Sequence, residues 1–373
     1  MNRPFDGVTI IEHVGARAPL GERLAIGLAG RVAADLGATV MKIEPPQGDP
    51  LRAMPPLLGK TGVLFAFLNA GKKSLALAED DRDVRERLAR RSNAVLLDAT
   101  TGVDGISEIG VDAAIRTMPV TVLVSMLGHG DAMRMPASEF TVMALGGILD
   151  IVGDPNLEPL RLGGHQAAYS AGLAAFSGLA AALCQPASQT SGALAQEIVE
   201  VSLLETAIWL NWKTIATAAT GGRVPKRSGQ AGDWPIIRCA DGWVALVYMD
   251  ADFAGLRRLI GDDPRLADPL LATDAGRVGR TAEIAAVVEE HLRAMTRAEI
   301  HQRSLELRLP LGPVLSLTDL FDNPHVMARD FLRMVSVDGA PAASMPRLPV
   351  LWNGQGFAAG DVPAKPSRSG VFA

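Results

Sequence analysis

The residues best placed to do chemistry lie in the stretch 161–173, RLGGHQAAYSAGL, where a polar, glycine-bearing loop meets an apolar, alanine-rich run. That pattern is typical of a loop feeding the first turn of a buried helix. His165 has the side chain of a general base, although a polar loop histidine without chemistry is the plainer interpretation. No carboxylate lies between Glu158 and Glu197.

The composition is that of an ordinary globular protein. The 373 residues are 48% hydrophobic and 21% charged, and a chain of this length is expected to form two domains. The formal net charge of −5 argues against nucleic acid as a partner, because phosphate binding needs a basic face. Cys184 and Cys239 are too few for a disulfide framework or a metal site. Both are expected to be buried as small apolar residues.

The N-terminal residues lack the basic and apolar regions of a signal peptide. Apolar runs such as 172–183 are shorter than the roughly 20 residues that span a bilayer. These features favour a soluble, cytoplasmic protein with no membrane partner.

The first third of the chain alternates short β-branched runs with helical patterns, which predicts parallel βαβ units in a doubly wound α/β domain. Ligands of such sheets bind outside the carboxyl ends of the strands. Neither GxGxxG nor GxxxxGK[ST] is present, so a standard nucleotide-phosphate cradle is not supported. The strands are expected at 8–12, 38–43, 73–77, 94–97 and 120–125, and the helices at 21–36, 80–91 and 111–117.

The remainder is expected to be mostly helical over 140–210, with one long helix at 203–217 whose Trp209 and Trp212 pack in a core. A hairpin turning at Asp241-Gly242 opens a second unit, followed by helices at 253–259, 282–294 and 297–307. The predicted division is a large domain over 1–219, a glycine-rich linker over 220–234, a small domain over 235–325 and a return to the large domain over 326–373.

Eight motifs occur in an order and spacing that resemble the family III CoA transferases of the carnitine dehydratase and bile-acid-inducible type, which include the α-methylacyl-CoA racemases. They are AGRVAADLGATVMKIEPPQGDPLR (29–52), LNAGKKSLAL (68–77), VSMLGHG (124–130), GGILDIVG (146–153), AAYSAGLAA (167–175), VEVSLLETA (199–207), IIRCADGWVAL (236–246) and LPLGPVLSLTDLFDNPHVMARDF (309–331).

This resemblance implies an α/β fold with a Rossmann-like large domain and a small α+β domain. It also implies a dimer of two interlinked chains. The substrates would be CoA thioesters and free carboxylic acids, with no permanently bound cofactor.

In transferases of this family, an aspartate at the loop-to-helix junction attacks the acyl-CoA carbonyl and then carries CoA as an enzyme thioester. The family pattern ADLxAG, read back from Ala171-Gly172, puts Ala168 at the place of the aspartate. Tyr169 and Ser170 would be far poorer nucleophiles for this route. The resemblance therefore leaves the catalytic residue unknown.

The racemases of the family use a histidine and an aspartate, which fall here at Ser138 and again at Ala168, so racemisation is disfavoured. Glu139, beside Ser138, is a conceivable base, and a capping or solvated glutamate is the plainer interpretation. His165 is the other weak candidate.

The resemblance also implies residues that contact CoA. Lys72-Lys73 stands where the family has a basic pair suited to phosphates, and Arg52 follows the second strand. Asp98 lies in a loop (97–102) where the family has a neutral amide, and an acid there would repel pyrophosphate. His129 is placed to stack on or hydrogen-bond the pantetheine arm, or to be an ordinary interface histidine.

Three functions follow from these features. The first is the non-catalytic subunit of a heteromeric CoA transferase, active only with a catalytic paralogue. The second is an active enzyme on CoA esters that uses Glu139 or His165 as base. The third is a regulatory protein that binds CoA esters. The partner would be a second copy or a paralogous chain.

Overall fold

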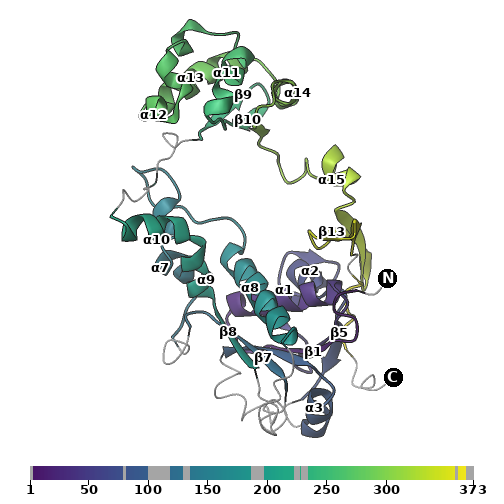
Figure 1. Cartoon of the computed structure of the whole chain (residues 1–373). Coiled ribbons are helices and arrows are strands. Elements are labelled where there is room, and N and C mark those ends of the chain that lie inside the picture. Colours follow the sequence, from purple (N-terminus) through teal and green to yellow (C-terminus); the bar gives the residue numbers. More distant parts are fainter. Residues whose placement is uncertain are drawn as a thin grey trace. The chain divides into compact units, whose positions relative to one another are not determined.

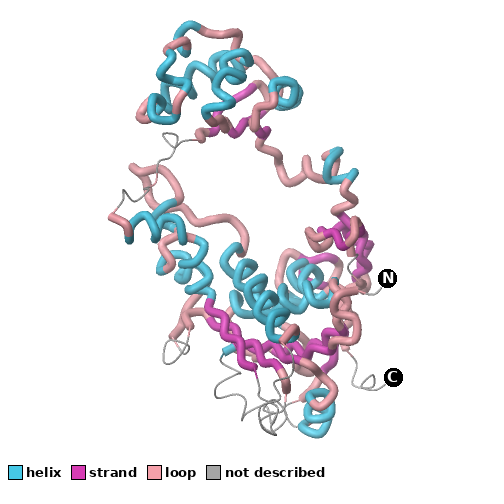
Figure 2. The backbone as a smooth tube through the Cα atoms, viewed as in Figure 1, coloured by secondary structure: helices cyan, strands magenta, loops and turns pink. Residues whose placement is uncertain are grey.

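The computed structural model describes residues 3–78, 81–99, 118–128, 135–185, 197–221, 227, 234–357 and 360–366. The chain divides into two compact units (Figures 1 and 2), described separately below. The larger unit comprises residues 1–148, 162–216 and 325–373, and the smaller comprises 149–161 and 217–324. The helix expected at 111–117 and most of the linker expected at 220–234 lie outside the described residues.

The larger unit is built on a six-stranded sheet whose strands are all parallel. Numbered by their occurrence in the chain, the six strands lie in the order third, second, first, fourth, fifth, sixth. This is the doubly wound arrangement, and its order reverses between β1 and β6. Across the sheet the strands are β5 (Lys73–Ala76), β2 (Thr39–Glu44), β1 (Thr9–His13), β6 (Ala94–Asp98), β7 (Val120–Ser125) and β8 (Glu197–Ser202).

The strands expected from β-branched runs are confirmed, whereas β8 was missed. Its sequence, EIVEVS, places two glutamates among the apolar residues, so it lacks the continuous apolar run of the other strands. The expectation of a mostly helical segment over 140–210 was wrong at this strand.

The helices α1 (Leu20–Asp35), α2 (Val63–Asn69) and α8 (Gln166–Leu183) cover one face of the sheet, and α3 (Arg82–Ala89) covers the other (Figure 1). The backbones of α1 and α8 approach closely at Gly172. A Cβ atom at that position would lie 2.7 Å from the carbonyl oxygen of Ala25. Only glycine permits this approach without displacing one of the helices.

The long helix expected at 203–217 is two helices, α9 (Leu203–Leu210) and α10 (Trp212–Ala219). At the break, the side-chain amide of Asn211 donates to the carbonyl oxygen of Gly146 over 2.7 Å. Trp209 and Trp212 are 72% and 63% exposed, so the expectation that they pack in a core was wrong. Cys184, expected to be buried, is exposed as well.

The rest of the larger unit is made of short elements and a C-terminal return. The backbone amide of Gly71 donates to the carbonyl oxygen of Asp361 over 2.8 Å. The short elements are η1 (Pro50–Ala53), β3 (Leu57–Leu58), β4 (Thr61–Gly62), α7 (Glu139–Leu145), β12 (Leu332–Val337), β13 (Ala340–Pro346), β14 (Leu351–Trp352) and β15 (Gln355–Gly356).

The smaller unit places helices against an antiparallel sheet and has its own apolar core. The expected hairpin is confirmed, with Asp241 at its turn. Residues 149–161 group with this unit, where Arg227 donates to the carbonyl oxygen of Asp154. The elements are η3 (Leu149–Ile151), β9 (Ile236–Cys239), β10 (Gly242–Ala245), α11 (Asp250–Leu259), η5 (Pro264–Leu266), η6 (Pro269–Ala272), α12 (Asp274–Arg277), α13 (Thr281–Leu292), α14 (Arg297–Leu307) and β11 (Gly312–Pro313), with α15 (Pro324–Ala328) at the boundary.

Among the described residues, no helix has the length and apolar character needed to cross a membrane.

The close approach of α1 and α8 is testable with Gly172→Val. Because the new side chain would overlap the Ala25 carbonyl and the Leu28 side chain, we expect a loss of about 1–3 kcal/mol in the free energy of unfolding. Ala174→Val, at an exposed position of the same helix, should cost less than about 0.7 kcal/mol. Urea unfolding of both variants measures the difference, and equal losses would contradict the packing argument.

Candidate active site

The N-terminus of α8 carries the junction singled out in the sequence. Ala168 lies in the first turn of this helix and is completely buried. Its backbone amide donates to Oε1 of Glu139 over 3.1 Å. A carboxylate from another helix therefore satisfies an amide that the helix itself leaves without an acceptor.

The structure brings the two weak catalytic candidates, Glu139 and His165, into direct contact. Nδ1 of His165 lies 2.7 Å from Oε2 of Glu139. Glu139 begins α7, where Ser138 caps the helix by accepting from the amide of Thr141. His165 immediately precedes α8, and its side chain does not cap that helix. Two helix starts thus hold the pair together.

The Glu139 carboxylate lies among hydrogen-bond donors at the starts of two helices. A helix N-terminus carries partial positive charge, and an amide N–H donates to the carboxylate directly. Burial, followed by the charge of Glu139, raises the pKa of the Tyr169 hydroxyl. With Nδ1–H donating to Glu139, the other ring nitrogen of a neutral His165, Nε2, is the basic one.

Aromatic rings line this junction. The rings of His165 and Tyr169 meet edge to face with centroids 6.1 Å apart, and Tyr169 meets Phe67 in the same way at 6.5 Å. Among the described residues, the hydrogen bonds of Glu139 connect it to His165 and to the Ala168 amide. Ser170, the other hydroxyl considered from the sequence, is not joined to the pair.

The residues expected to contact CoA lie elsewhere in the larger unit, and two of them point inward. The Lys72 side chain is fully buried and ion-paired with Glu12, and burial lowers the pKa of its ammonium. Arg52 forms a two-pronged pair with Glu44 and lies 3.8 Å above the ring of Phe65. Neither cation presents a free charge at the surface.

Lys73, by contrast, is exposed, so the predicted phosphate contact of the Lys72-Lys73 pair rests on Lys73. Asp98 ends β6 at the reversal of strand order and is completely buried. Its Oδ1 accepts from the amide of Gly15 over 2.7 Å, which ties the ends of β6 and β1 together. His129 and residues 100–102 lie outside the described residues.

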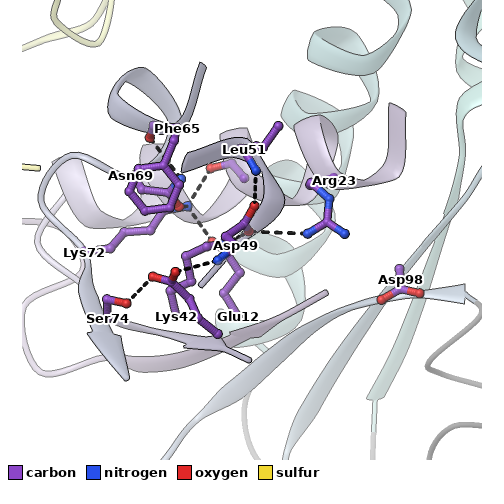
Figure 3. Close-up of polar contacts among 12 residues, drawn as sticks. Glu12, Arg23, Lys42, Asp49, Leu51, Phe65, Asn69, Lys72, Ser74 and Asp98 are labelled. Carbon is purple, nitrogen blue, oxygen red and sulfur yellow. Dashed lines mark hydrogen bonds and ion pairs between the residues drawn. The ribbon is translucent and has the colours of Figure 1, made fainter. Parts of the chain in front are cut away.

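A buried charge network that the sequence analysis missed joins these elements (Figure 3). The Lys42 ammonium lies 2.9 Å from both Glu12 and Asp49, and Arg23 lies 3.3 Å from Asp49. Burial alone would raise the pKa of Asp49, but Lys42 and Arg23 hold it at about 2. The sequence did carry a signal for this network, because Glu12 and Lys42 are charged residues that interrupt apolar strands. The structure pairs them in register.

Comparison with known proteins shows that the chain belongs to CoA-transferase family III, whose model matches residues 18–366. It is 27% identical over 352 residues to an acetyl-CoA:oxalate CoA-transferase of Acetobacter aceti, covering 88% of this chain and 85% of that protein. It is also 27% identical over 329 residues to a succinyl-CoA:mesaconate CoA-transferase of Haloarcula marismortui, covering 82% and 81%.

Solved structures of similar fold include a CAIB/BAIF family protein from Brucella suis. It has a TM-score of 0.76 and 23% identity over 94% of this chain and 97% of that one. A hypothetical protein from Mycobacterium tuberculosis has a TM-score of 0.78 and 21% identity over 96% and 95%. These likenesses confirm the expected fold.

Glu22 is a further buried acidic group that the sequence analysis missed. It lies in the first turn of α1, is only 1% exposed and accepts from the amide of Met126 over 2.9 Å. Burial, and then the charge of Asp98, raises the pKa of Glu22 to about 8. At neutral pH the Glu22 carboxyl is therefore expected to be protonated beside the charged Asp98.

The raised pKa of Glu22 makes the free energy of unfolding depend on pH. Between the ordinary carboxyl pKa and about 8, the folded protein holds a proton that the unfolded chain releases. The contribution of Glu22 is therefore present at low pH and is lost as the pH rises towards 8. Glu22→Gln keeps an oxygen for the Met126 amide and cannot ionise, so its stability relative to the wild type should increase from pH 5 to pH 9.

Urea unfolding at a series of pH values measures this gain. Glu205→Gln, an exposed glutamate in the first turn of α9, serves as the control and should leave the wild-type profile unchanged. A gain for Glu22→Gln that does not vary with pH would contradict the assignment.

Proposed function

We propose that this chain is a subunit of a CoA transferase that acts on an acyl-CoA and a carboxylic acid, and that it supplies no nucleophile for the transfer. The names of its relatives support the substrate class, since each pairs a CoA thioester with a free acid. CoA thioesters would be substrates or ligands, with no permanently bound cofactor.

The observation that carries the proposal is the methyl group of Ala168 in the first turn of α8. A methyl group cannot attack a thioester, and formation of an acyl-enzyme needs a carboxylate free to do so. The nearby carboxylate of Glu139 accepts from both the Ala168 amide and His165, and its side chain is 9% exposed. These bonds engage both of its oxygens.

A second chain would supply the missing aspartate. The surface of α9 and α10 supports such a partner, because large exposed apolar patches are typical of protein–protein contacts. We infer an interlinked dimer, formed with a paralogous chain or with a second copy. The exposed side chains of this surface are Ile208, Trp209, Leu210, Trp212 and Ile215.

The subunit assignment predicts that the chain alone does not transfer CoA from acetyl-CoA or succinyl-CoA to a free acid, and that it does so when co-expressed with an aspartate-bearing paralogue. Trp209→Arg should reduce assembly and activity, because it charges the proposed contact surface. Trp352→Arg, at another exposed tryptophan, is the matched control. Full transfer by the purified chain alone would refute the assignment.

Restoring the nucleophile gives a separate test. If the loss of the carboxylate is the only defect, Ala168→Asp should recover measurable transfer in the homodimer, while Ala168→Asn, of similar size, should not. Trapping the acyl-enzyme with hydroxylamine identifies the covalent step. An Ala168→Asp variant that folds and stays silent would point to a second defect in CoA binding, at residues 98–102, where the sequence departs from the family.

A further inference from the structure

We propose that Glu139 and His165 form a general-base pair that hydrolyses a CoA thioester with water at the N-terminus of α8. The inference rests on the proposed function only in taking a CoA thioester as the ligand. The absence of a nucleophile removes transfer through an acyl-enzyme, but it does not remove a reaction in which water attacks directly.

The contact geometry is that of an oriented base. The Oε2 atom of Glu139 lies 2.7 Å from Nδ1 of His165, which fixes the tautomer with the proton on Nδ1 and the lone pair on Nε2. The His165 side chain is 25% exposed, and Nε2 is the ring atom that would meet a water molecule. The carboxylate also favours the imidazolium that forms when Nε2 takes a proton.

The histidine is the more exposed member of the pair, as expected for the residue that contacts water. The side chain of Glu139 is 9% exposed and that of His165 is 25% exposed. The carboxylate is therefore held inside, where the Ala168 amide fixes its second oxygen at 3.1 Å, and the imidazole extends towards solvent. The Tyr169 ring meets the imidazole edge to face, and this contact limits the rotation of the imidazole.

The reaction is balanced without any further reactant. Nε2 of His165 accepts a proton from water as the water oxygen forms a bond to the thioester carbonyl carbon. The tetrahedral intermediate then collapses, the carbon–sulfur bond breaks, and the imidazolium returns the proton to the CoA sulfur. The products are a free carboxylic acid and CoA. Glu139 acts only through His165 and is a positioning residue.

A purely structural role for Glu139 has to be distinguished from this one, because the same carboxylate stabilises the first turn of α8. That role needs only the bond to the Ala168 amide and does not involve His165. Substitution of His165 therefore distinguishes the two roles, because its side chain makes no cap of its own.

The experiment measures thiol release from acetyl-CoA and succinyl-CoA by the purified full chain. His165→Asn can still donate to Glu139 but has no basic nitrogen, so it should lower the hydrolysis rate about 100-fold or more. His165→Ala should recover activity on addition of imidazole, a readout that a structural role would not give. His301→Asn, at an exposed histidine of α14, is the matched control and should retain full activity.

Glu139→Gln tests the positioning role. The amide retains an oxygen for the Ala168 N–H but loses the charge that orients and stabilises the imidazolium, so kcat should fall while KM stays nearly constant. Thermal unfolding identifies any variant whose loss is caused by misfolding. A Glu139→Gln enzyme with unchanged kcat would overturn the pairing.

Calorimetric titration with succinyl-CoA separates this inference from the proposed function. If the chain binds succinyl-CoA and releases no thiol, hydrolysis is refuted and the subunit role stands. If neither the chain nor its complex with a paralogue binds succinyl-CoA, both fail. Incorporation of solvent deuterium at the α-carbon without thiol release would also overturn hydrolysis, because it would make His165 a base for carbon acids.

Discussion

The larger unit depends on the carboxylate of Glu12, which lies between the ammonium groups of Lys42 and Lys72 in the interior. Removing one partner of such a buried pair leaves an uncompensated charge that costs about 3–5 kcal/mol. The surrounding backbone is shaped around this contact, because a Cβ atom on Gly30 of α1 would lie 2.1 Å from the Glu12 carboxylate. The contacts of Glu12 with Lys42 and Lys72 thereby set the position of α1 on the sheet. The helix α8 packs against α1 in turn.

The same network explains why charges expected to meet a CoA phosphate point inward. Asp49 holds Lys42 and Arg23, and Arg23 donates to the carbonyl oxygen of Gly15 over 2.8 Å. The amide of Gly15 in turn donates to Asp98. A continuous series of polar contacts therefore runs from the end of β2 to the reversal of strand order between β1 and β6. Its charges stabilise the loops at this edge of the sheet.

Periodicity predicted the strands of the sheet because parallel strands buried on both faces read as continuous apolar runs. It failed where burial is decided by distant parts of the chain. The strand β8 is exposed at two of its six positions, and Trp209 lies on a helix that buries only Leu203 and Ala207. The contact between Glu139 and His165 is of the same kind, since two residues 26 positions apart meet through the tertiary fold. The sequence identified both residues as candidates, but it did not predict that they are in contact.

The electrostatics at the start of α8 connect the missing nucleophile to the pair that remains. The first-turn amides and the helix dipole favour a negative charge at this position. With alanine at position 168, the Glu139 carboxylate accepts from the Ala168 amide and from His165 together. A carboxylate whose two oxygens are so engaged is a weakened nucleophile, because attack on a thioester would break one of these bonds. The same engagement makes it a strong orienting group for the imidazole, so the arrangement that disfavours an acyl-enzyme favours the activation of water.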